Sequence, residues 1–137
     1  MPQKINTILL VDDDDAVNFY NKRLLLKSEL GVSLVPLYNG AEAIRKIITL
    51  NNSLSNKDLV LVFLDLNMPI LDGWGFLEEF KKIHYALNFS VEIYVLSSSI
   101  NPSDIEKSKQ NILVKDYISK PLTNEKLIEL KQLYVDN

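Results

Sequence analysis

Four hydrophobic segments of this 137-residue chain each end on side chains that could do chemistry. In chain order, they end on Asp12 and Asp13, on Asp65, on Ser97 and on Lys120. Continuous aliphatic runs are typical of strands buried on both faces, as in a parallel sheet. The carboxyl ends of such strands face one crevice, where ligands bind. The pattern therefore predicts that three carboxylates, one hydroxyl and one ammonium group meet at a single site.

The three carboxylates indicate the chemistry that this site could perform. At close range they repel one another, so either some are protonated or a cation lies among them. Carboxylate oxygens with room for water suit Mg²⁺, whereas a chain with no cysteine and a single histidine disfavours zinc and copper. An aspartate facing Mg²⁺ can attack phosphorus and form an aspartyl phosphate. In that reaction Lys120 would pair with one phosphoryl oxygen, and Ser97 would donate a hydrogen bond to another.

Each of these residues also has an ordinary structural interpretation. A single aspartate after a strand is usually an N-cap, and Asp14 and Asp15 are expected to be of that kind. Lys120 alone would be a solvated surface lysine, and Ser97 alone a loop hydroxyl. Their joint placement at strand ends favours a functional site.

The composition is that of a soluble globular protein, and we predict one domain over 1–137. Hydrophobic residues make up 47% of the chain and charged residues 24%. The net charge of −3 and the lack of a basic stripe argue against a nucleic-acid partner. We predict a cytoplasmic location without a membrane partner, because there is no signal-peptide core and no apolar stretch of the roughly 20 residues that a membrane span needs.

Apolar runs alternate with amphipathic stretches, which predicts repeated strand–helix units around a parallel sheet. Five strands and five helices are expected in strict alternation. The first strand is expected near 6–11 and the second over 32–37, with a helix between them that ends at Gly31. Pro36 cannot donate a hydrogen bond to a neighbouring strand, so the second strand should lie at a sheet edge.

Capping signals mark the starts of later helices. Asn39 and Glu42 have the spacing of a capping box, and Asp72 and Thr123 can cap the third and fifth helices. Asn101, followed by proline, is typical of an N-cap before the first helical position. The apolar stripe of the second helix is expected to comprise Ala43, Ile44, Ile47 and Ile48.

At this point the chain resembles the receiver domains of two-component response regulators, from about residue 6 to about residue 135. The motifs that carry the resemblance are Val11-Asp12-Asp13, Leu64-Asp65-Leu66-Asn67-Met68-Pro69 with Asp72-Gly73, Leu96-Ser97-Ser98, and Tyr117-Ile118-Ser119-Lys120-Pro121. The resemblance implies an α/β fold of the doubly wound, flavodoxin-like kind. This is a three-layer sandwich whose five-stranded parallel sheet has the order 2-1-3-4-5. Because the chain stops just after the fifth expected helix, we also expect a stand-alone receiver without an output domain.

The resemblance assigns roles to the site residues. Asp65 looks like the phosphoacceptor, which receives a phosphoryl group from a histidine kinase or a histidine phosphotransfer protein. Asp13 and Asp65 look like direct Mg²⁺ ligands, together with the main-chain carbonyl of Asn67, while Asp12 acts largely through water. Lys120 resembles the lysine of the family that precedes a proline, whose peptide bond is commonly cis.

Ser97 and Tyr117 match the switch pair of this family. On phosphorylation, the hydroxyl of Ser97 would move toward the phosphoryl group, and the ring of Tyr117 would turn into the vacated space. The surface expected to change comprises the fourth helix, the fifth strand and the fifth helix. That surface would bind an unidentified downstream protein.

Other functions are also compatible with parts of the pattern. The chain is not expected to be an enzyme beyond its own phosphorylation and dephosphorylation. A phosphohydrolase of the haloacid dehalogenase type would need an acid/base where Asn67, an amide, follows Asp65. A flavodoxin would need a hydroxyl-rich phosphate loop, but an acidic run follows the first strand. An interaction module that works without phosphorylation is the main alternative, and the full set of polar residues argues against it.

Overall fold

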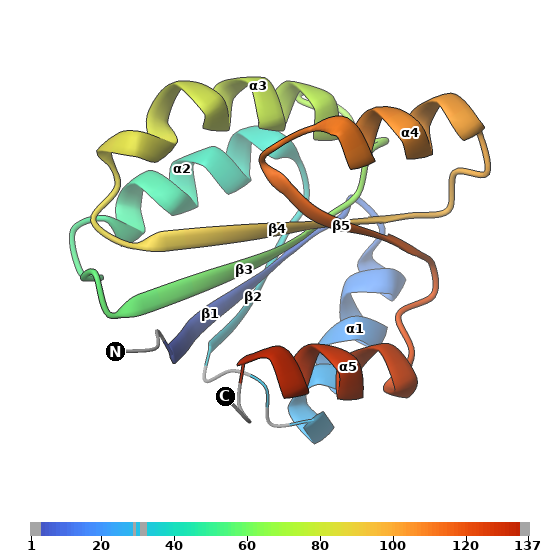
Figure 1. Cartoon of the computed structure of the whole chain (residues 1–137), viewed down its shortest axis with the longest axis horizontal. Coiled ribbons are helices and arrows are strands. Elements are labelled where there is room, and N and C mark those ends of the chain that lie inside the picture. Colours follow the sequence, from blue (N-terminus) through green and yellow to red (C-terminus); the bar gives the residue numbers. More distant parts are fainter. Residues whose placement is uncertain (1–3, 29, 31–32, 135–137) are drawn as a thin grey trace.

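The computed structural model describes residues 4–28, 30 and 33–134. Strands and helices alternate along the chain, and the helices cover both faces of one sheet (Figure 1). The strands are β1 Lys4–Val11, β2 Ser33–Leu37, β3 Asp58–Leu64, β4 Ser90–Ser97 and β5 Val114–Ser119. The helices are α1 Asp15–Ser28, α2 Gly40–Leu50, α3 Gly73–Ile83, the short 3₁₀ helix η1 His84–Ala86, α4 Pro102–Gln110 and α5 Asn124–Tyr134. Gly31 and Val32, where a helix end and a strand start were predicted, lie outside the described residues.

The sheet is parallel, with the order β2-β1-β3-β4-β5. This confirms the predicted doubly wound, flavodoxin-like α/β fold. Pro36 pairs with Leu10 on the inner neighbour β1, and β2 forms one edge of the sheet, as the proline predicts. Among the described residues, no helix combines the length and the apolar character that crossing a bilayer requires.

Two apolar cores lie on opposite faces of the sheet. Alternate residues of the central strands point to opposite faces, so Leu9 and Val62 belong to one core, and Leu10 and Phe63 belong to the other. The first core packs against α2 and α3, and the second packs against α1 and α5 (Figure 1). Burial on both faces holds the central strands rigidly, and their carboxyl ends carry the candidate site.

The predicted caps are present. Asn39 accepts a hydrogen bond from the backbone N–H of Glu42, and Asp72 accepts one from Gly75. Asn101 and Thr123 likewise cap α4 and α5. The prediction that Ile48 belongs to the apolar stripe of α2 is wrong, because this side chain is 52% exposed. The buried stripe of α2 runs through Ala43, Ile47 and Leu50, and Ile48 lies about 100° around the helix from Ile47, on the side that faces solvent.

The loop after β3 contains a strained residue. Ile70 has a φ of 68°, and the N–H of Leu71 donates to the carbonyl of Pro69 at 2.8 Å, which closes a γ-turn. A positive φ is uncommon for any residue except glycine and asparagine, and it is especially unfavourable for a β-branched one. The side chain is 85% exposed, so packing returns little of this cost.

We therefore expect Ile70→Asn to raise the free energy of unfolding by about 1 kcal/mol, because asparagine tolerates a positive φ. Urea denaturation monitored by circular dichroism would measure the change. Ile112→Asn is a matched control, because Ile112 is 95% exposed and has no positive φ. A shift of equal size in both variants would show that loss of an exposed isoleucine is responsible, and not the backbone.

Candidate functional site

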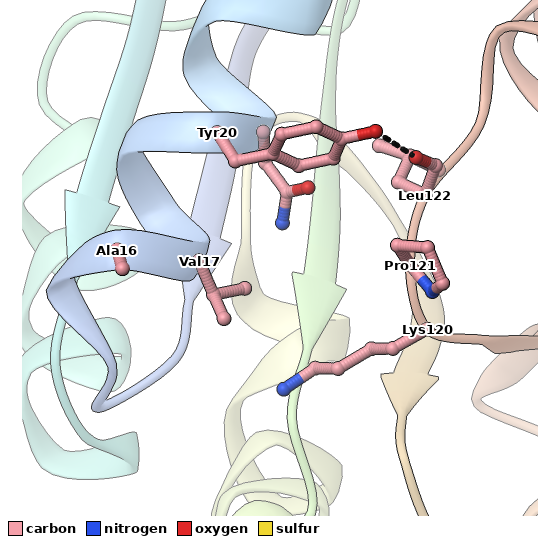
Figure 2. Close-up of a pocket in the computed structure, with 7 residues that line it drawn as sticks. Ala16, Val17, Tyr20, Lys120, Pro121 and Leu122 are labelled. Atoms are coloured by element: carbon pink, nitrogen blue, oxygen red, sulfur yellow. Dashed lines mark hydrogen bonds between the residues drawn. The ribbon is translucent and has the colours of Figure 1, made fainter.

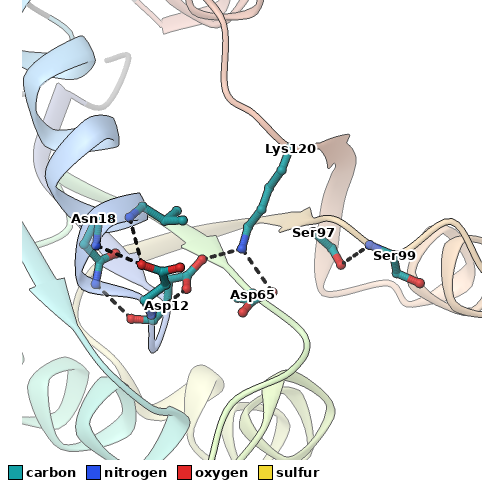
Figure 3. Close-up of polar contacts among 9 residues, drawn as sticks. Asp12, Asn18, Asp65, Ser97, Ser99 and Lys120 are labelled. Carbon is teal, nitrogen blue, oxygen red and sulfur yellow. Dashed lines mark hydrogen bonds and ion pairs between the residues drawn. The ribbon is translucent and has the colours of Figure 1, made fainter.

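The predicted carboxylates and Lys120 meet at the carboxyl edge of the sheet, whereas the hydroxyl of Ser97 at the same edge is bonded to Ser99 (Figure 3). Asp12 and Asp13 follow β1, Asp65 follows β3, and Lys120 follows β5. One carboxylate oxygen from each of the three aspartates lies within 4.8 Å of the others. Asp12 and Asp65 are buried, while Asp13 is exposed at the mouth of the cluster. The adjacent strand ends bring these groups together, although more than 100 residues separate Asp12 from Lys120.

Lys120 is the cation of the cluster. Its Nζ donates to Asp12 Oδ2 at 2.6 Å and lies 3.5 Å from Asp65 Oδ1. Burial acts to lower the pKa of Lys120, but the two carboxylates outweigh burial and raise its pKa overall. The ammonium group therefore stays charged and is shared unequally, with the shorter contact to Asp12.

Asp65 is left with incomplete charge compensation. Burial raises the pKa of its carboxyl group, and the charge of Asp12 raises it further. Lys120 and the backbone N–H groups of Leu66 and Asn67 act in the opposite direction without cancelling this effect. A carboxylate in this state favours either a proton or an additional cation.

The donor set fits a hard divalent cation. It consists of oxygen atoms alone, it converges within a few ångströms, and one member is open to solvent. Mg²⁺ prefers such carboxylates and retains water in its remaining positions. Asn67, whose carbonyl was predicted as a further ligand, is exposed in the loop beside Asp65.

Backbone and side-chain bonds hold Asp12 in place. Its N–H donates to the carbonyl of Leu37 on the neighbouring strand at 3.0 Å. Its Oδ1 accepts from the N–H of Asp14, and its main-chain carbonyl accepts from Asn18 Nδ2 at 2.8 Å. The sequence reasoning missed Asn18. Its one visible signal was a polar amide of modest helix propensity within the first helix.

The predicted switch residues converge on a residue between them. Ser97 is buried, and its Oγ accepts a hydrogen bond from the N–H of Ser99 at 3.1 Å. Tyr117 Oη donates to the carbonyl of Ser99 at 2.7 Å. The hydroxyl of Ser99 donates to Asp104 in the first turn of α4 at 2.9 Å. Ser99 therefore connects the hydroxyl at the site both to Tyr117 and to α4.

A groove of about 370 Å³ opens beside Lys120, between α1 and the segment that follows β5 (Figure 2). It is lined mainly by apolar atoms of Ala16, Val17, Tyr20, Asn21, Lys120, Pro121 and Leu122. The side chain of Tyr20 crosses the groove, and its Oη donates a hydrogen bond to the carbonyl of Leu122 at 3.1 Å. The Lys120–Pro121 peptide bond is cis, as the resemblance to receiver domains implied.

Comparison with known proteins points to a single family. The sequence matches the model of the response regulator receiver domain over residues 8–132. A two component response regulator from Cytophaga hutchinsonii is 29% identical, with a TM-score of 0.79 over 98% of this chain and 100% of that chain. A response regulator receiver protein from Dyadobacter fermentans is 26% identical, with a TM-score of 0.75 over 95% and 97% of the two chains. The CheX-CheY-BeF3-Mg+2 complex from Borrelia burgdorferi shows the same fold at 20% identity, with a TM-score of 0.72 over 95% and 90%.

The fold and the site together define a flavodoxin-like protein with an acidic pocket at the carboxyl edge of its sheet. Since the family match spans nearly the whole chain, the chain belongs to the response regulator receiver domains. Receiver domains bind Mg²⁺ at an acidic cluster, which Asp12, Asp13 and Asp65 form in this protein. They belong to two-component signalling and interact with kinases or phosphotransfer proteins.

Proposed function

We propose that this protein is a cytoplasmic response regulator that accepts a phosphoryl group on Asp65. The donor is a histidine kinase or a histidine phosphotransfer protein of a two-component or phosphorelay system. The observation that carries this proposal is the buried Asp65 carboxylate, which lies beside two further aspartates and 3.5 Å from the ammonium group of Lys120.

The proposed reaction transfers phosphorus from nitrogen to oxygen. An Asp65 carboxylate oxygen forms a bond to phosphorus as the N–P bond of phosphohistidine breaks, and the imidazole leaves with the bonding electrons and takes up a proton. Lys120 pairs with one phosphoryl oxygen, and Ser97 donates its hydroxyl hydrogen to another. Asp13, Asp65 and the carbonyl of Asn67 would hold Mg²⁺ directly, with Asp12 acting through water. When bound, Mg²⁺ neutralises the negative charge that accumulates on the phosphoryl oxygens.

The groove beside Lys120 supports docking of the donor on the α1 side. The mainly apolar groove is lined in part by Lys120, whose Nζ lies 3.5 Å from Asp65 Oδ1, so a donor docked there would bring its phosphohistidine close to Asp65. Phe19, which precedes Tyr20 on α1, is 63% exposed. Exposed apolar area of this kind is typical of surfaces that bind other proteins.

The output surface proposed from the switch pair comprises α4, β5 and α5. Ser97 is hydrogen-bonded to Ser99, and Ser99 is hydrogen-bonded to Asp104 of α4 and to Tyr117. A movement of Ser97 would therefore change the hydrogen bonds at this surface. Ile112, between α4 and β5, is 95% exposed. This apolar side chain supports binding of a downstream protein there. Apart from its own phosphorylation and dephosphorylation, the protein is proposed to have no enzymatic activity.

Incubation with acetyl phosphate and Mg²⁺ is expected to add one phosphoryl group, because Asp65 can displace acetate from this small donor. Intact mass spectrometry would measure the gain, and EDTA should prevent it. If acetyl phosphate fails, a phosphorylated histidine kinase is the next donor to use. Failure with both donors would favour an interaction module that works without phosphorylation.

A further inference from the structure

Asn18 is a buried polar residue of α1 with no assigned role. It is 3% exposed, and its side chain lies next to Asp12 (Figure 3). Its Nδ2 donates to the main-chain carbonyl of Asp12 at 2.8 Å. Its Oδ1 has no hydrogen-bond partner among the described residues. Burial of an unpaired amide oxygen is costly, so the residue calls for an explanation.

The orientation of the Asn18 amide follows from hydrogen-bond chemistry. A carbonyl can only accept, so the NH₂ group must face Asp12, and the oxygen must face the other way. Asn18 lines a narrow void together with Asp65 and Phe63, and this void is too tight to admit a water molecule. A hydrocarbon side chain of similar size would avoid the unpaired oxygen. What asparagine adds is the bond to Asp12.

That bond acts on the geometry of both members of the acidic pair. The carbonyl of Asp12 belongs to the peptide group that joins Asp12 to Asp13, and this group is planar. The N–H of Asp12 is already fixed by the carbonyl of Leu37. The peptide groups on both sides of Asp12 are thus held, which fixes the direction in which its side chain leaves the backbone and the plane from which Asp13 starts. Asp12 is thereby directed to Lys120, whereas Asp13 is directed to the exposed mouth of the cluster.

We propose that Asn18 is a positioning residue for the metal site: it fixes the Asp12–Asp13 peptide plane so that both carboxylates can serve one Mg²⁺ ion. The inference rests on the proposed function, in which these aspartates hold the ion. Partners that orient ligands without touching the metal commonly change metal affinity by 10-fold or more when they are removed.

The chain offers a matched control one turn further along the same helix. Asn21 is also 3% exposed and lines the same void. Asn21 and Asp12 both belong to the described residues, and the structure has no hydrogen bond between them. Asn18→Leu and Asn21→Leu therefore remove similar buried amides, but only the first removes a bond to the acidic pair.

The test is a titration of the unphosphorylated protein with MgCl₂, measured by calorimetry and by fluorescence of Trp74, the single tryptophan. We expect Asn18→Leu to raise the Kd for Mg²⁺ about 10-fold and Asn21→Leu to leave it within about twofold of wild type. An unchanged Kd in Asn18→Leu, or an equal rise in both variants, would overturn the proposal. If Asn18→Leu does not fold, Asn18→Ala is judged by the same criteria.

Phosphorylation by acetyl phosphate separates this inference from the proposed function. If the wild type is phosphorylated but Asn18→Leu binds Mg²⁺ normally, only the inference on Asn18 fails. If the Kd changes as expected but neither acetyl phosphate nor a histidine kinase phosphorylates the wild type, only the proposed function fails. Absence of Mg²⁺ binding by the wild type would overturn both.

Discussion

Lys120→Ala is expected to lower the free energy of unfolding by about 3 kcal/mol at neutral pH without Mg²⁺, because it leaves two buried carboxylates without their cation. Lys120 Nζ forms an ion pair with Asp12 and lies near Asp65. The side chains of the two aspartates are each less than 10% exposed. Urea denaturation would measure the loss. Added Mg²⁺ should restore much of it, since the ion supplies the missing positive charge.

Lys115→Ala is the control for this variant. Lys115 pairs with Glu92 at 3.4 Å, but its side chain is 51% exposed, and such pairs contribute roughly 0–1 kcal/mol. Equal losses in the two variants would mean that the buried location of Lys120 has no special effect. A loss that Mg²⁺ does not reduce would mean that packing of the lysine stem, and not its charge, is responsible.

The same variant tests the switch. If Lys120 transmits the presence of the phosphoryl group, Lys120→Ala should still be phosphorylated, but the NMR shift changes over residues 97–130 should be lost. Retention of the full shift pattern would exclude this role for Lys120. Identical spectra of phosphorylated and unphosphorylated wild-type protein would instead remove the basis for the Ser97–Tyr117 switch.

Asp65→Asn is expected to abolish phosphorylation while the fold is retained, because an amide cannot act as the nucleophile. Intact mass after treatment with acetyl phosphate and Mg²⁺ would show this. Asp72→Asn is a suitable control in the same loop. Asparagine caps a helix as well as aspartate does, so α3 should be unaffected and the phosphoryl group should still be gained. A phosphorylated Asp65→Asn protein would place the acceptor on another residue.

The same substitution should change how stability depends on pH. The pKa of Asp65 in the folded protein is raised above its ordinary value of 3.8, mainly by burial and then by Asp12. Between these two values the folded state holds more protons than the unfolded state, so this group lowers stability as the pH rises. Without Mg²⁺, Asp65→Asn should therefore gain stability relative to wild type as the pH is raised from the ordinary pKa of 3.8 to neutral pH. Parallel urea midpoints at both pH values would contradict this.

Much of the fold could be predicted because its signals are local. The buried strands are continuous apolar runs, and the capping residues stand next to the turns that they satisfy. Pro36 shows how far such an argument extends, since a missing N–H alone placed β2 at the sheet edge, as observed. The assembly of Asp12, Asp65, Ser97 and Lys120 also followed from local reasoning, because each terminates a strand and parallel strands end at one edge.

By itself, the sequence determined which residues stand at the carboxyl ends of the strands, and hence the chemistry of the site. Only the tertiary structure decided how these groups are paired. It placed Lys120 closer to Asp12 than to Asp65, joined Asn18 to the Asp12 carbonyl, and left Ile48 exposed. Residue types and spacing follow the periods of single helices and strands, whereas a contact between distant residues depends on how helices pack against the sheet. That packing is a property of the whole molecule. It determines which carboxylate pairs with Lys120 and which is left to bind a metal ion.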